Sequence, residues 1–146
     1  MSRNKMTKQK DVAMTGLVGL IGIAKAADLN PSVVPIDVPI TISPGISKWL
    51  PLWCCVGNQS ANGQARVFFD LWTGPNATGQ CLDYPSGGLV ASTTGFTILQ
   101  QLGQPLTPPS LPGPLTATTV YINIVRGDGA PLTADIWIIG QDLTSV

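Results

Sequence analysis

Apolar residues recur at every second position along most of this chain, and this pattern constrains its fold more than any other feature. In the clearest example, Val120, Ile122 and Ile124 alternate with other side chains between residues 118 and 125. A period of two residues is typical of β-strands. The sixteen glycines and thirteen prolines among the 146 residues also disfavour long helices, because both residues break helix interiors. Comparable runs are found at 32–42, 65–72, 89–99 and 132–140, with a weaker one at 49–56.

These runs predict an all-β fold for residues 31–146. We expect an antiparallel β-sandwich, Ig-like or jelly-roll, of five to eight short strands separated by glycine and proline turns. The first run, 32–42, contains Pro35 and Pro39. Because proline cannot donate to a sheet ladder, we expect an edge strand or an arm there.

Residues 1–30 have a different pattern, a basic stretch followed by the uncharged sequence VAMTGLVGLIGIA at 12–24. We expect this part to be a separate N-terminal arm or targeting segment. The apolar stretch is too short to span a bilayer as a helix, which takes about 20 residues. One interpretation is a secretory signal peptide that is cleaved near Ala26. The other is a short apolar helix that is retained and buried in a partner or in lipid.

Charge is distributed unevenly along the chain, although the net charge is zero. Five of the eight basic residues lie within the first 25 residues, against the single acid Asp11. From residue 26 onward, seven acids outnumber three bases. A basic tail on an acidic body predicts that the N-terminal arm contacts an anionic surface, such as a membrane, a nucleic acid or an acidic protein.

The composition excludes many kinds of catalytic and metal site. All of the acids in the chain are aspartates, and it contains no histidine. Histidine triads, histidine general bases and histidine metal ligands are therefore ruled out within it. Asp70 and Asp83, which flank a glycine-rich loop, come nearest to the carboxylate pair of a glycosidase. Roles at turns or strand ends explain both residues equally well. We therefore expect no enzymatic activity, no cofactor, no metal and no small-molecule substrate.

The three cysteines are Cys54, Cys55 and Cys81. Neighbouring strand residues point to opposite faces, so at most one of the adjacent pair could form a disulfide with Cys81. Such a bond would leave one thiol for a bridge to another subunit. The alternative is three reduced cysteines buried as small apolar side chains.

The strands carry more apolar side chains than a two-layer sandwich can bury, Trp137 and Ile139 among them. A surplus of this kind is typical of proteins that self-assemble. The candidate assembly contacts are apolar residues of the N-terminal segment and of the first run, namely Leu17, Leu20, Ile21, Ile36, Val38 and Ile40.

The tripeptide Arg126-Gly127-Asp128 matches the sequence of integrin ligands. Its last residue forms an Asp-Gly turn signal with Gly129, which predicts that the tripeptide lies at a hairpin tip. These three residues are therefore a candidate display loop, and the turn alone explains them equally well.

Together these features favour a non-catalytic structural subunit, with copies of itself or other structural subunits as partners. Our first hypothesis is a virion protein (capsid, vertex or capsid-decorating) whose N-terminal arm docks on its neighbours. The second is a secreted subunit of a surface filament, pilin-like or adhesin, with a cleaved signal peptide and residues 32–42 donated as a strand. The third is a secreted carbohydrate-binding module, which would gather its tryptophans on one exposed platform. The four tryptophans are Trp49, Trp53, Trp72 and Trp137.

Overall fold

The computed structural model describes residues 17–29, 37–60, 65–83, 87–92, 98–102, 114–129 and 132–145. Within these ranges nine strands form one antiparallel sheet, and no helix occurs. The all-β prediction is confirmed. The strands are β1 (Val18–Asp28), β2 (Asp37–Ile42), β3 (Trp49–Gly57), β4 (Ala65–Gly74), β5 (Thr78–Cys81), β6 (Leu89–Ser92), β7 (Ile98–Gln101), β8 (Thr119–Gly129) and β9 (Thr133–Asp142).

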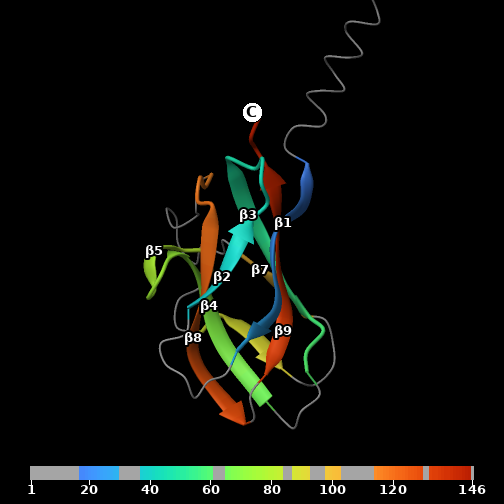
Figure 1. Cartoon of the computed structure of the whole chain (residues 1–146), viewed down its shortest axis with the longest axis vertical. Coiled ribbons are helices and arrows are strands. Elements are labelled where there is room, and N and C mark those ends of the chain that lie inside the picture. The colour runs from blue at the N-terminus through green and yellow to red at the C-terminus, as the bar shows by residue number, and fades with distance from the viewer. Residues whose placement is uncertain are drawn as a thin grey trace, which may run out of the picture.

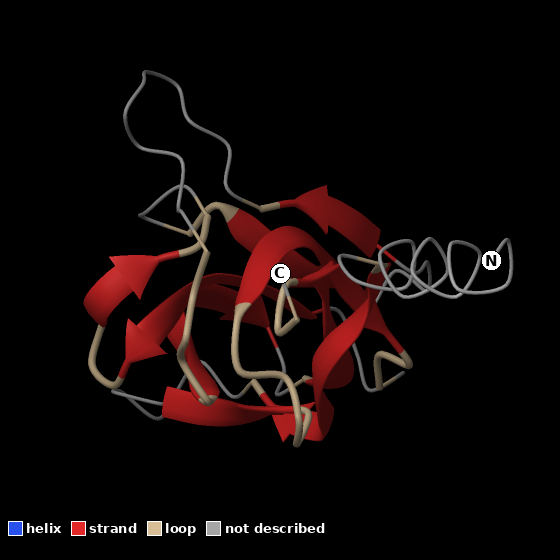
Figure 2. Ribbon diagram, turned by 90° about the horizontal axis from the view of Figure 1, so that it is seen from above, coloured by secondary structure: helices blue, strands red, loops and turns tan. Residues whose placement is uncertain are grey.

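The sheet curls into a half-barrel around a common interior (Figure 1, Figure 2). The strand order is β5-β4-β8-β2-β1-β9-β3-β7, and β6 pairs with β4 at the same edge as β5. All nine strands therefore belong to one connected sheet, and the two separate sheets of a β-sandwich are not confirmed.

The curl brings the two edges of the sheet together at β6 and β7. The side-chain oxygen of Gln100 in β7 accepts a hydrogen bond from the Val90 N–H of β6 at 2.7 Å. The side-chain NH₂ of Gln100 donates to the Val90 carbonyl oxygen at 3.0 Å. One side-chain amide thus pairs with a strand as a backbone peptide would, and it links the two edges where no strand ladder joins them.

The inner face of the curled sheet is the hydrophobic core. Alternate side chains of β4, β8 and β9 point into it and are fully buried, as the period of two predicts. Backbones also approach closely, because a Cβ at Gly140 of β9 would overlap the carbonyl oxygen of Leu50 in β3. The largest of the fully buried side chains are Trp49, Phe69, Ile21, Leu29, Ile40, Leu71, Leu82, Leu89, Ile122, Leu132, Ile136 and Ile138.

The helix expected at 12–24 is wrong for residues 18–24, which lie in β1. This strand sits inside the sheet between β2 and β9, and its register pairs Leu20 with Ile139 and Ile23 with Trp137. Register shifts after Leu20 and after Ala24 interrupt the alternation along β1. The apolar residues of this segment therefore do not recur at every second position, which is why its sequence did not predict a strand. Residues 12–16 lie outside the described residues.

Asp135 of β9 binds the backbone of β1 at its second register shift, between Ala24 and Ala27. Ala26 has φ 49°, in the left-handed region that a non-glycine residue rarely adopts. Its N–H donates to Asp135 Oδ1 at 2.7 Å, and the side-chain amide of Asn58 donates to Oδ2 at 2.7 Å. These hydrogen bonds lower the pKa of Asp135, that from Ala26 most. The ionised carboxylate thus connects β1 to the residue that follows β3.

β2 is an internal strand, so the edge strand or arm expected at 32–42 is wrong for residues 37–42. It pairs with β8 from Asp37 to Thr41, and with β1 at Thr41 and Ile42. Because β1 reaches only the end of β2, its ladder does not need an N–H from Pro39. Residues 32–36 lie outside the described part of the chain.

Candidate functional site

The outer surface of β1, β9, β3 and β7 carries a continuous set of apolar side chains. Leu20, Ile139 and Trp53 form one row across β1, β9 and β3. A second row continues onto β7, because Trp137 pairs with Cys55, and Cys55 pairs with Leu99. We call this surface the apolar face, and its residues are Leu20, Ile23, Trp53, Cys55, Leu99, Trp137 and Ile139.

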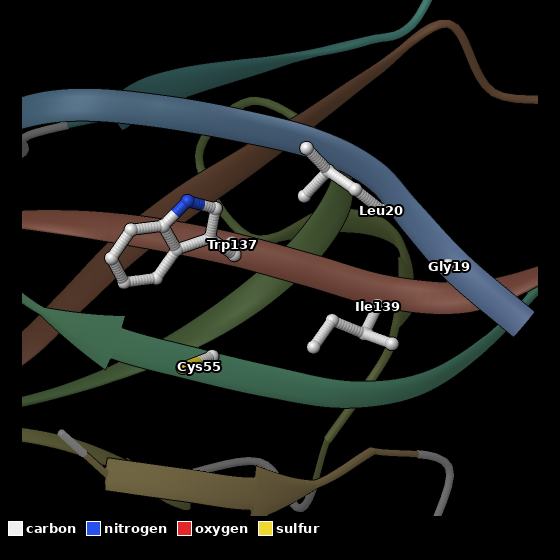
Figure 3. Close-up of a pocket in the computed structure, with 5 residues that line it drawn as sticks. All are labelled: Gly19, Leu20, Cys55, Trp137 and Ile139. Carbon is white, nitrogen blue, oxygen red and sulfur yellow. The ribbon is translucent and has the colours of Figure 1, made fainter.

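A shallow depression of about 320 Å³ lies in the apolar face between β1, β9 and β3 (Figure 3). Gly19 and Leu20 line it from β1, Trp137 and Ile139 from β9, and Cys55 from β3. The side chains of the other four residues supply apolar walls. None of the five lining residues is charged.

Several apolar side chains on this side of the molecule are exposed to solvent. Leu20 at one border of the apolar face is 52% exposed, and Leu99 at the other is 57% exposed. Leu17 and Val18, just before Gly19, are exposed as well. Exposed apolar residues that are scattered singly need no explanation, whereas a contiguous patch is typical of an interaction surface.

The structure divides the predicted assembly contacts into two groups. Leu17 and Leu20 are exposed and remain available to a partner. Ile21 and Ile40 are fully buried in the core of this chain, so their assignment as assembly contacts is wrong. The physical reason is that the register of β1 and β2 points these two side chains inward. Val38 is half-buried and packs against the same core, and Ile36 lies outside the described residues.

All three cysteines are free thiols, which is the second of the two alternatives left open by the sequence. Cys54 points into the core and Cys55 onto the apolar face, as adjacent strand positions require. Cys81 instead donates a hydrogen bond to Asp83 Oδ1 at 3.2 Å. Burial raises the pKa of Cys54, Cys55 and Cys81, which keeps all three protonated near neutral pH.

The tripeptide Arg126-Gly127-Asp128 lies inside β8, so its assignment to a display loop at a hairpin tip is wrong. Its residues pair in register with β4, Arg126 opposite Phe68 and Asp128 opposite Arg66. The Arg126 guanidinium lies 4.2 Å from the centre of the Phe68 ring, a cation–π contact. The strand continues to Gly129, through the Asp-Gly signal, and β8 pairs with β2 and β4.

The four tryptophans do not form one platform. Trp49 is fully buried and donates its indole N–H to the Ala117 carbonyl oxygen at 3.1 Å. Trp53 and Trp137 share the apolar face, whereas Trp72 lies on β4 opposite Tyr121 of β8. An aromatic platform of the kind that we considered for sugar binding is therefore limited to two rings.

Asp70 and Asp83, which the sequence analysis considered as a pair, do lie together. Asp70 belongs to β4 and is 3% exposed, and Asp83 follows β5. Asp70 Oδ1 accepts hydrogen bonds from the N–H groups of Gly87 at 2.8 Å and Gly88 at 3.1 Å. Asp83 Oδ1 accepts from the Leu71 N–H at 2.9 Å. The two carboxyls thus connect β4 to both ends of the β5–β6 connection.

The pKa of Asp83 is raised well above that of an exposed aspartate. Burial and a side-chain hydrogen bond with Asp70 raise its pKa to about 8. Its Oδ2 atom is buried and receives no hydrogen bond from a donor group. Direct hydrogen bonding also places them closer together than the roughly 5 Å or more that separates the carboxylates of a glycosidase.

Two further kinds of site were sought among the described residues. No three histidine, cysteine, aspartate or glutamate side chains in that part of the chain come together as metal ligands. No helix within the described ranges is long and apolar enough to cross a membrane.

Comparisons with known proteins identify no family for this chain. No protein-family model matches it, and neither curated proteins nor solved structures show significant similarity.

Proposed function

We propose that this protein is a non-catalytic structural subunit that associates with copies of itself through the apolar face. The observation that carries the proposal is the exposure of Leu20 and Leu99 at the two borders of a surface whose central depression has no charged lining residue. Full burial of a leucine side chain is worth about 1.5–3 kcal/mol. Association that buries these side chains would therefore stabilise the assembled state relative to the isolated chain.

Charge favours a second copy of this chain as the occupant. The net charge is zero, so copies do not repel one another strongly. The basic residues before position 26 and the acidic excess after it also attract each other between copies. The depression itself offers no charged group to a strongly basic or acidic partner. An apolar contact between identical chains fits these features together.

Within this function we propose a virion protein, capsid, vertex or capsid-decorating, in preference to a secreted filament subunit. Cleavage near Ala26 would remove most of β1, which pairs with both β2 and β9. Donation of residues 32–42 to a neighbour would require β2, which already pairs on both sides. These pairings support a retained N-terminal segment and disfavour both features of the filament hypothesis. The burial of Trp49 disfavours the carbohydrate-binding module.

Sedimentation velocity of the full chain over a range of concentrations tests self-association. We expect the wild-type protein to associate, and Leu20→Thr and Leu99→Thr to weaken association by about tenfold each, since each removes roughly 1.4 kcal/mol or more of apolar burial. Threonine suits strands, so both variants should remain folded. Val125→Thr is the matched control, because Val125 is exposed but lies on β8, outside the apolar face.

A wild-type chain that stays monomeric at high concentration would overturn the proposal, and so would equal weakening in all three variants. The virion setting has its own test, which is the intact mass of the protein from its natural source. A mass near 15.3 kDa supports a retained N-terminus, and loss of the first 26 or so residues contradicts it.

A further inference from the structure

We propose that the depression in the apolar face is covered by residues 12–16 of a neighbouring copy of this chain. These residues belong to the N-terminal extension, residues 1–16, which precedes the described part of the chain. The inference rests on the proposed self-association and names the segment of the partner that enters the depression. It is supported by the place where the extension joins the sheet, by the sequence of residues 12–16 and by the charge of the residues before them.

The N-terminal extension joins the sheet at the border of the apolar face. The exposed Leu17 accepts a hydrogen bond at its carbonyl oxygen from the Asp142 N–H, at 3.1 Å. Gly19 and Leu20 follow it in β1 and line the depression, which continues toward Trp137 of β9. Followed backward to Leu17, β1 therefore leads away from the depression. A neighbouring copy can receive residues 12–16 directly, whereas the chain's own depression would require a reversal of direction just before Leu17.

Residues 12–16 match the depression in polarity and in length. Their sequence is VAMTG, the longest uncharged stretch of the extension, and the lining of the depression has no charged residue. Five extended residues span about 16 Å, and the four positions of β9 from Trp137 to Gly140 span about 13 Å. Met14, at the centre of the stretch, has a flexible thioether that fills irregular apolar sites and contacts aromatic rings favourably. Trp137 offers such a ring.

The charge of the extension indicates which part of it enters the depression. Four of its first ten residues are basic, whereas seven acids outnumber three bases from residue 26 onward. Burial of a basic side chain against the uncharged lining would be costly. Outside the depression, the same bases are attracted to the acidic body of the receiving copy. The charge pattern thus favours residues 12–16 in the depression and residues 1–11 beyond it.

Disulfide trapping between two different full-length chains tests this contact, because Cys55 lines the depression as a free thiol. The donor chain carries Met14→Cys and Cys55→Ser, and the receiving chain keeps Cys55. Both chains carry Cys81→Ser, which removes the other partly exposed thiol, and Cys54 is buried. After the two are mixed with oxidised glutathione, we expect a linked pair of chains. Peptide mapping should join position 14 of the donor to Cys55 of the receiver.

Asn4→Cys in the donor, in place of Met14→Cys, is the matched control, because position 4 belongs to the basic part of the same extension. Its link to Cys55 should form about tenfold more slowly, since its effective concentration at the depression is lower. Equal rates from the two positions would overturn the proposal, and so would the absence of any link from position 14. A link found only within one chain, in Met14→Cys with Cys55 retained, would also overturn it, because the extension would then cover its own depression.

Sedimentation velocity of full-length Met14→Asp provides a second measurement. A carboxylate at position 14 would be buried against an uncharged lining, so we expect association to weaken by about tenfold or more. Asn4→Asp makes the same change of charge outside residues 12–16 and should have a smaller effect. Equal weakening in the two variants would contradict the proposal, since only the overall charge of the extension would then matter.

Failure of this inference and failure of the proposed function give different results. If the wild type associates while position 14 neither links to Cys55 nor affects association, residues 12–16 are not the occupant, and another surface of the copy covers the apolar face. If the wild type stays monomeric at high concentration, the self-association itself is refuted, and this inference with it.

Discussion

The apolar face and a polar row on the outer surface of β2, β8 and β4 cover one continuous core but have opposite chemistry. On the apolar face, Leu20 and Leu99 are exposed. On the second surface the register aligns Asp37, Asn123 and Asp70 across the three strands. Asp70 is nevertheless almost completely buried, because the ends of the β5–β6 connection bind to it. One surface thus leaves apolar groups in solvent, and the other removes a carboxyl group from it.

Both arrangements run against the usual preference of side chains, and each requires a compensating contact. A buried carboxyl group is costly unless it is hydrogen-bonded or protonated, and here it is hydrogen-bonded within the chain. An exposed apolar surface is costly unless a partner covers it, and no segment among the described residues is placed over the depression. The comparison teaches that the buried carboxyl of Asp70 has its compensating contacts within one chain, whereas the exposed leucines of the apolar face do not.

Substitutions in the shared core provide the largest expected effects and test whether the difference is confined to the outer surfaces. Ile138 of β9 lies beneath the apolar face, and Ile122 of β8 lies beneath the outer surface of β2, β8 and β4. Both side chains are fully buried. Replacement of either by alanine should lower the free energy of unfolding by about 2–5 kcal/mol. Urea denaturation of Ile138→Ala and Ile122→Ala checks this. A much smaller loss for one of them would mean that the core itself differs between the two halves.

A pair of glycines on the apolar side gives the next largest effect. Gly140 and Gly19 are opposite each other in β9 and β1. A Cβ on Gly140 would overlap the Leu50 carbonyl oxygen, whereas a Cβ on Gly19 would meet no atom within 4 Å. Gly140→Ala should therefore cost about 1–3 kcal/mol, and Gly19→Ala should have little effect on folding. Thermal unfolding of the two variants tests this, and equal stability would contradict the close approach of β9 to β3.

The pH dependence of global stability sharpens the comparison further. Because the pKa of Asp83 is raised to about 8, stability should decline from about pH 4 to pH 8, by at most about 1.4 kcal/mol per unit. Asp135 and Asp142 have lowered pKa values, so their contribution is lost only as the pH falls below about 4. Urea denaturation at several pH values measures both windows. Asp83→Asn should remove the decline above pH 4, and a profile unchanged by that variant would place its origin elsewhere.

Much of the fold was predictable from the sequence because several strands have a regular period of two. The alternation in the runs that became β4, β8 and β9 follows directly from one face that meets the core and one that does not. β1 was missed because its register shifts conceal this period. The internal position of β2 was missed because Pro39 favoured an edge, and only the tertiary structure shows that β1 stops short of it.

The candidate site was predictable only in part. The sequence pointed to Asp70 and Asp83 from their positions beside a glycine-rich loop, and to Trp137 and Ile139 from the surplus of apolar residues. It could not show that β5, whose sequence TGQC has no apolar alternation, pairs with β4 and so brings the two carboxyls together. It also could not separate Leu20 from Ile21, because one residue of register decides which of them faces solvent.

The pairing of β1 with β9 has a consequence for how the chain reaches its structure. Val18 lies opposite Gln141, so the first and the last of the described strands meet across more than a hundred residues of sequence. Contacts between residues so distant along the chain are slow to form, because a long loop must close before they contribute. The sheet therefore cannot be completed before β9 has been synthesised. Until β9 has emerged, one side of β1 lacks its partner, and the chain must be protected from aggregation during that interval.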